Sequence, residues 1–237
     1  MDFNRLIEEF QKYYYSEMLM FIAELTALII GIWYARKDNS WLFFIAYIIF
    51  DFCILLADWY LIADIKISYK IKFDFRNLTN TLIAFVELLV YYSYFGKILD
   101  GNKIKKCLIF LITIYSLTII FFIATKFDFL TTNYGYVADI IGATEFVFLL
   151  VPCVYYFLQL LKANSTLRLT ERPSFWIVTG IFFYALISIP NYLLHRHFIN
   201  IHYEIRYLFV AVLYYFPFTA NFIFLIKAFL CKKTLTI

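Results

Sequence analysis

Residues 137–161 read VADIIGATEFVFLLVPCVYYFLQLL, and this stretch decides the class of fold. It is 25 residues long, contains no Lys or Arg, and is followed by Lys162. About 20 apolar residues in a helix are enough to cross the roughly 30 Å hydrocarbon core of a bilayer. The stretch nevertheless holds Asp139 and Glu145, and a carboxylate near the centre of a span costs about 2.5–3.5 kcal/mol on insertion scales. It therefore predicts a transmembrane helix with an inward-facing polar side.

Six other stretches share this pattern of a long apolar run bounded by short polar breaks. The seven predicted spans cover residues 18–34, 41–63, 78–95, 107–125, 137–161, 175–194 and 207–226. Backbone amides in lipid must be hydrogen-bonded within the segment, and the alternation typical of transmembrane strands is absent, so each span is predicted to be α-helical. A composition of 64% hydrophobic and 16% charged residues agrees with this class. We expect an all-α, polytopic, seven-transmembrane-helix bundle.

Residues 1–16 differ from the spans because their apolar side chains form a stripe. Phe3, Leu6 and Phe10 fall on one side of a helix, opposite Arg5 and Lys12. This pattern predicts a short interfacial amphipathic helix ahead of a seven-helix domain at residues 17–237. A helix that docks on a partner protein is the alternative. No cleavage-site pattern follows, so we expect the first span to be retained.

The basic residues indicate an orientation. With the N-terminus outside, 12 of the 21 Lys and Arg residues fall in the cytoplasmic loops and the C-terminal tail. The positive-inside rule therefore favours an N-outside, C-inside arrangement in a bacterial inner membrane, although the basic loop at residues 66–76 argues against it. The net charge of +4 suits anionic lipid headgroups and provides no dense basic patch, so no nucleic-acid partner is expected.

Carboxyl groups inside the spans are the main candidates for function. Asp51 and Asp58 are seven residues apart and share a helix face, and Glu87 is followed by Tyr91 one turn later. Because a carboxyl group facing lipid is costly, we expect these groups to point into the bundle. The candidate ligand- or ion-binding residues are Glu24, Asp51, Asp58, Glu87, Tyr91, Asp139, Glu145, Asn191 and Asn221.

Two interpretations of these residues remain open. They could form a buried network or cavity that binds a cation, a proton or a polar ligand, with some carboxyl groups protonated at neutral pH. They could instead bond internally to Tyr, Thr and Asn side chains and only set the helix register. Pro152, Pro190 and Pro217 are predicted to kink their spans, which could line a cavity or serve packing alone.

Several signatures of catalysis and metal binding are absent. The chain has no Gly-rich phosphate loop, no HExxH pair and no G-x-S-x-G elbow. An aspartyl hydrolase would need carboxyl groups from two different helices. His195, His197 and His202 lie together before the last span, but no nearby cysteine completes a zinc site. We therefore expect a non-enzymatic protein without a cofactor, a metal site or a disulfide framework.

Residues 171–184, ERPSFWIVTGIFFY, carry a resemblance to a known group. They resemble the P-x-F-W-I-x-x-G-x-x-x-Y segment of small seven-helix membrane proteins from Bacteroidota-type bacteria. Residues 80–99 and the ending at residues 224–231 are similar to the same group, so the resemblance covers most of residues 75–231. Related membrane modules precede histidine-kinase domains, and the resemblance thus implies a sensory or signalling membrane module.

These patterns favour a receptor-like membrane protein that acts through a separate cytoplasmic or membrane signalling protein. A small cation- or proton-coupled transporter or channel that uses the buried carboxyl groups is the first alternative. A scaffolding subunit of a membrane complex is the second. The sequence leaves the ligand and the oligomeric state open.

Overall fold

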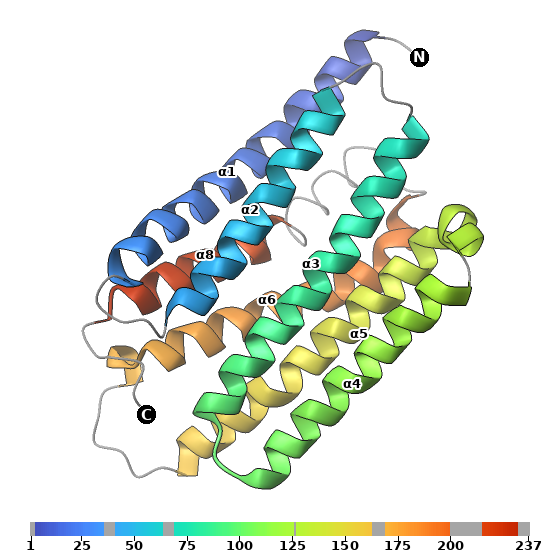
Figure 1. Cartoon of the computed structure of the whole chain (residues 1–237). Helices are drawn as coiled ribbons and strands as arrows, with labels where there is room; N and C mark the ends of the chain where they lie inside the picture. The colour runs from blue at the N-terminus through green and yellow to red at the C-terminus, as the bar shows by residue number, and fades with distance from the viewer. Residues whose placement is uncertain are drawn as a thin grey trace. The chain divides into compact units, whose positions relative to one another are not determined.

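The computed structural model describes residues 3–35, 41–63, 69–125, 127–162, 169–199 and 215–231, and within these ranges every regular element is helical. The helices are α1 (Phe3–Ala35), α2 (Leu42–Ala63), α3 (Tyr69–Ile98), α4 (Asn102–Thr125), α5 (Phe127–Lys162), the short 3₁₀ helix η2 (Leu169–Glu171), α6 (Pro173–Ile199) and α8 (Phe216–Phe229). The predicted all-α class is confirmed for the described part of the chain (Figure 1).

Four helical segments are long and apolar enough to cross a membrane. They are Thr79–Ile98, Asn102–Phe121, Ile140–Lys162 and Pro173–Leu194. Three shorter apolar helical segments cover Met18–Tyr34, Leu42–Ala57 and Phe216–Phe229. The helices are those of a helical membrane protein, whereas the number of seven spans stays a prediction. Residues 207–214, the first part of the last predicted span, lie outside the described residues.

The N-terminal segment continues into the first predicted span. Residues 3–35 form the single helix α1, without a break near residue 17. No Gly or Pro occurs before Gly31, so the sequence contains no helix-breaking residue at the predicted boundary. The amphipathic stripe itself falls on side chains outside the described ones, and its placement along a membrane surface stays a prediction.

The chain forms two compact units. Unit 1 takes Met1–Ser40 and Asn164–Thr236 and holds α1, η2, α6 and α8, whereas unit 2 takes Trp41–Ala163 and holds α2 to α5. The first helix of the chain therefore packs with the last ones, and the four helices between them form a unit of their own.

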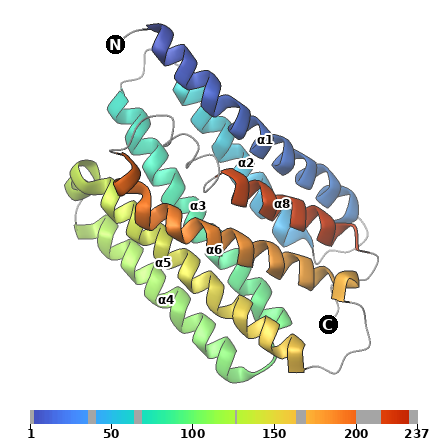
Figure 2. The same cartoon turned by 180° about the vertical axis from the view of Figure 1, so that it is seen from behind.

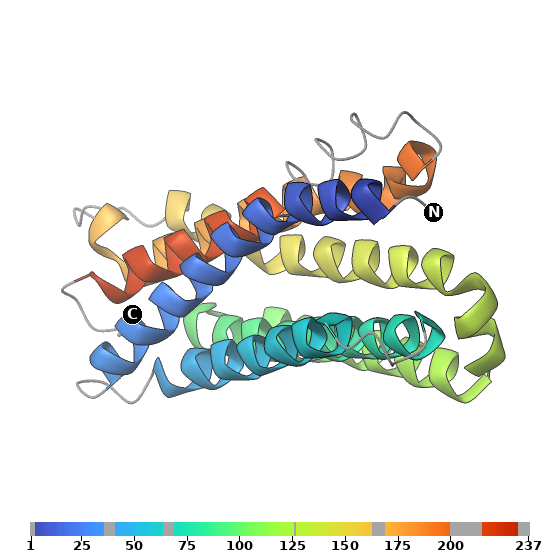
Figure 3. The ribbon, with the colours of Figure 1, turned by 90° about the horizontal axis from the view of Figure 1, so that it is seen from above.

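Unit 2 is organised around α3, which contacts α2, α4 and α5 (Figures 1 and 3). Helices α2 and α3 run antiparallel: the ring centroids of Phe44 and Tyr94 are 5.1 Å apart, and those of Tyr47 and Tyr91 are 6.0 Å apart. Helix α5 follows the hairpin partner α4 and so runs parallel to α3.

A tight turn joins α3 to α4 and is held by α5. Gly101 adopts a φ of +109°, a region that residues with a Cβ rarely occupy. The side-chain amide of Gln159 donates a hydrogen bond to the carbonyl oxygen of Asp100 at 3.0 Å. The turn and the C-terminal part of α5 therefore lie at the same end of unit 2.

Unit 1 is organised around α8, which lies between α1 and α6 and contacts both (Figure 2). Gly180 of α6 allows the close approach, because a Cβ added there would lie 2.8 Å from Cβ of Phe224 and 3.0 Å from Oδ1 of Asn221. The ring of Phe224 also stacks on those of Trp176 and Phe183, at 6.0 and 6.1 Å between centroids.

We predict that Gly180→Ala destabilises unit 1, because the new methyl group would lie too close to Cβ of Phe224 in α8. Overpacking of this kind costs about 1–3 kcal/mol. Gly96→Ala is the matched control: Gly96 lies within a helix, and a Cβ there would meet nothing within 4 Å. Thermal unfolding in detergent micelles should show a lower midpoint for Gly180→Ala alone, and equal midpoints would show that the α6–α8 approach is not tight.

Candidate functional site

Three helices of unit 2 each place one carboxyl group in its interior. Asp51 of α2, Glu87 of α3 and Glu145 of α5 are only 5%, 2% and 3% exposed. The carboxyl groups of Glu87 and Glu145 interact with each other electrostatically. Two groups that could both carry negative charge therefore lie within electrostatic range of each other in the apolar interior of one unit.

The packing register brings the third carboxyl group to the same level. Tyr47 meets Tyr91 between the antiparallel helices α2 and α3. One turn further along α2 is Asp51, and one turn back along α3 is Glu87, so these two acids are level with each other. Asp51, Glu87 and Glu145 thus belong to one layer of unit 2.

Five buried tyrosines on the same helices and on α4 extend the buried polar set along the interior of unit 2. We name the whole set the acidic–tyrosine core, and its members are Asp51, Glu87, Glu145, Tyr47, Tyr91, Tyr94, Tyr115 and Tyr156, all of them buried. The ring of Phe44 lies against those of Tyr91 and Tyr94. No Lys, Arg or His is among the buried residues of the described chain.

Several oxygen atoms of the core have unused hydrogen-bonding capacity. Oδ2 of Asp51, Oε1 of Glu145 and the hydroxyl oxygen of Tyr94 have no hydrogen-bond partner among the described residues. An unsatisfied buried polar group costs about 1–3 kcal/mol. Internal bonding among the described side chains therefore does not account for all the polar atoms of this layer.

The chemistry open to this core follows from its charge. Two carboxylates near each other in a medium of low dielectric repel each other, and one proton removes that repulsion. Aspartate and glutamate can also hold cations, but no three His, Cys, Asp or Glu side chains in the described ranges are arranged to hold a metal ion. The core is therefore equipped to take up and release a proton.

A second set of buried polar residues lies in unit 1. Glu24 of α1, Asn191 of α6 and Asn221 of α8 are buried there, together with Ser188 and Thr219. The candidate residues are thus divided between the two units: Asp51, Glu87, Tyr91 and Glu145 belong to unit 2, and Glu24, Asn191 and Asn221 belong to unit 1.

Some predicted residues lie outside the described side chains. Asp58, Asp139 and the histidines His195, His197 and His202 are among them. All four cysteines, Cys53, Cys107, Cys153 and Cys231, are described and are free thiols.

The prolines have two kinds of position. The helices run on through Pro152 and Pro190. Pro217 instead lies in the first turn of the described helix α8. The residues just before Tyr215 lie outside the described ones, so the kink expected at Pro217 stays a prediction.

Sequence analysis did not identify Tyr47, Tyr115 and Tyr156 as parts of this core. Two of them carried a usable signal, because Tyr47 precedes Asp51 by one turn and Tyr156 follows Glu145 by three turns on the same helix face. Tyr115 carried none, since its span contains no acid and only tertiary packing places its ring 6.3 Å from that of Phe148.

Comparison of the chain with protein-family models, curated proteins and solved structures finds no match. Residues of the segment 171–184 have packing roles in unit 1. The indole N–H of Trp176 donates to the carbonyl oxygen of Thr170 at 2.8 Å, and Gly180 admits α8. The ring of Tyr184 packs edge-on against that of Phe218, at 5.7 Å between centroids.

The C-terminal end of α8 and the residues that follow it lie near Trp176 and Thr170. The ammonium group of Lys227 lies 5.8 Å from the centroid of the Trp176 ring. The thiol of Cys231 lies 3.8 Å from the carbonyl oxygen of Thr170. Burial raises the pKa of the Cys231 thiol, and the Lys227 ammonium partly offsets this rise.

We predict that Tyr92→Phe weakens the packing of α3 on α5 beside the core. The Tyr92 hydroxyl donates to the carbonyl oxygen of Phe148 at 3.0 Å, and such a bond contributes about 0.5–1.5 kcal/mol. Tyr155→Phe is the control, because its hydroxyl contact to Asp100 is long, at 3.5 Å, and exposed. Thermal unfolding should separate the two variants, and a larger loss for Tyr155→Phe would contradict the arrangement.

Proposed function

We propose that this chain is a non-enzymatic, receptor-like protein of a bacterial inner membrane, and that the acidic–tyrosine core is its input site. The observation that carries the proposal is the burial of Asp51, Glu87 and Glu145 in one unit, with Glu87 and Glu145 close enough to interact electrostatically. Ionisable groups inside membrane helices are costly. They almost always face the interior of the bundle and often mark proton or ion pathways. The species that this site takes up is a proton.

The core couples protonation to helix packing. When both Glu87 and Glu145 are ionised, their repulsion acts between α3 and α5, the helices that Tyr92 and Phe148 join by a hydrogen bond. When one of them is protonated, the repulsion disappears and a carboxyl O–H becomes available to an unsatisfied oxygen. Proton uptake therefore favours the closely packed form of these two helices.

The change has a route to one end of unit 2. Gln159 of α5 holds the carbonyl group of Asp100 in the α3–α4 turn. A shift between α3 and α5 thus moves this turn, which an N-outside orientation places on the cytoplasmic side. A cytoplasmic or membrane signalling protein that reads the turn is the partner we propose.

A proton-coupled transporter or channel is the second candidate, because the acidic layer lies within the apolar part of the helices. The two functions differ in one consequence: a transporter moves protons or cations across a bilayer, whereas a receptor only binds and releases them. Liposomes that contain the purified chain and an internal pH-sensitive dye separate the two. The proposal expects no leak above that of empty liposomes, and a sustained leak that Glu145→Gln abolishes would favour transport.

The proposal predicts that the folded protein becomes less stable as the pH rises, because unfolding would release the proton assigned to the core. One such proton changes the free energy of unfolding by about 1.4 kcal/mol per pH unit above the ordinary range of glutamate, about pH 4.3. Glu145→Gln should flatten this dependence, since the amide cannot titrate. The measurement is the thermal midpoint in detergent micelles between about pH 5 and 7.

The control for this prediction is Asp100→Asn, which removes an exposed carboxyl group in the same unit. Its pH dependence should equal that of the wild type. A wild-type protein whose midpoint is constant over the range, or a Glu145→Gln protein that keeps the full slope, would contradict proton uptake by the core.

A further inference from the structure

Five exposed lysines gather at one end of unit 2. We name this set the lysine collar: Lys97 at the end of α3, Lys103, Lys105 and Lys106 at the start of α4, and Lys162 at the end of α5. The tight turn at Gly101 brings the α3 and α4 members together, and the hydrogen bond from Gln159 to Asp100 brings the end of α5 beside them.

The charge of the collar is not balanced by the described part of the chain. Asp100 is the exposed carboxyl group beside it, and no ion pair joins it or any other described acid to a collar lysine. The Lys97 ammonium lies 5.8 Å from the centroid of the Phe43 ring. This contact positions the ammonium group and leaves its positive charge unneutralised. The first turn of α4 contains no acidic residue, so its lysines also face the positive end of the helix dipole.

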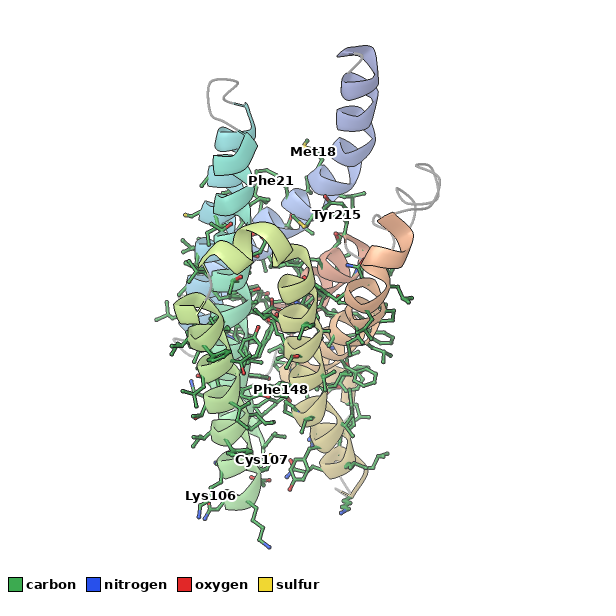
Figure 4. The ribbon with its side chains drawn as sticks, turned by 90° about the vertical axis from the view of Figure 1, so that its right-hand side faces the viewer. Met18, Phe21, Lys106, Cys107, Phe148 and Tyr215 are labelled. Atoms are coloured by element: carbon green, nitrogen blue, oxygen red, sulfur yellow. The ribbon has the colours of Figure 1, made fainter. Side chains whose placement is uncertain are left out.

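The collar borders an unusually apolar exposed surface. Helix α4 is the least buried of the four long apolar segments, with 17% of its window inside the structure. After Lys106, its exposed large apolar side chains are Ile109, Phe110, Ile114, Leu117, Ile120 and Phe121, and Thr113 is exposed among them. Figure 4 places Lys106 and Cys107 toward the lower end of the view, below Phe148. Acyl chains fit this face, and the collar then lies at the depth of the headgroups.

We propose that the lysine collar is a binding site for the phosphate groups of anionic phospholipids. The lysine ammonium groups attract the phosphodiester, and the apolar face of α4 receives the acyl chains of the same lipid. Each lysine near an anionic membrane surface contributes about a fivefold gain in affinity. This inference uses only α3, α4 and α5 and does not depend on proton uptake by the acidic–tyrosine core.

The experiment is a lipid titration of the full chain in dodecyl maltoside micelles, with the thermal midpoint as readout. Dioleoyl phosphatidylglycerol should raise the midpoint of the wild type, and zwitterionic dioleoyl phosphatidylcholine should not. The triple variant Lys103→Gln, Lys105→Gln, Lys106→Gln should require at least about tenfold more phosphatidylglycerol for the same rise. Added salt should weaken the effect, because it screens exposed charges.

Two controls make the result decisive. The triple variant with arginine at the same three positions keeps the charge and should keep the response to phosphatidylglycerol. Sodium phosphate tests the other source of the same chemistry, and the proposal expects no rise from it. An equal rise with phosphatidylcholine, a full response in the glutamine variant, or a rise with free phosphate alone would each overturn the assignment of a lipid headgroup site.

Discussion

The placement of carboxyl groups among apolar helices is the constraint on which the rest of unit 2 depends. Asp51, Glu87 and Glu145 can leave water only if helices α2, α3 and α5 enclose them together. Once enclosed, Glu87 and Glu145 act on each other, and the cost of ionising both is high. The register of the three helices follows from this one requirement, and the proposed uptake of a proton rests on it.

The sequence was sufficient to predict the helices and the inward direction of the acids. A carboxyl group that faces lipid is costly in any span. Burial could therefore be expected for each of Glu24, Asp51, Glu87 and Glu145. The sequence was not sufficient to predict which acids lie in the same unit. Pairing depends on the contact of Phe44 with Tyr94 and on the division of the chain into two units, and neither leaves a periodic signal. Glu24 therefore looked equivalent to Glu87 and belongs to another unit.

The α3–α4 turn connects the two proposals physically. Gly101 makes the turn possible, Gln159 attaches it to α5, and the lysine collar surrounds it. A change in α3–α5 packing would thus alter the spacing of the collar lysines, and anionic lipid bound there would in turn stabilise one packing. In unit 1 the tight contact is made by a different glycine, Gly180, whose missing Cβ lets α8 approach α6. The two glycines act for different reasons, one through its backbone conformation and the other through its size.

The central claim is that Glu87 and Glu145 hold a proton inside the membrane-type helices of unit 2. Infrared spectroscopy of the protein reconstituted in lipid at neutral pH tests it most directly, because a protonated carboxyl group has a C=O stretch that a carboxylate lacks. The account predicts this band in the wild type and a marked loss of it in the double variant Glu87→Gln, Glu145→Gln. A wild-type spectrum with carboxylate bands only, or a double variant with an unchanged carboxylic-acid band, would contradict it.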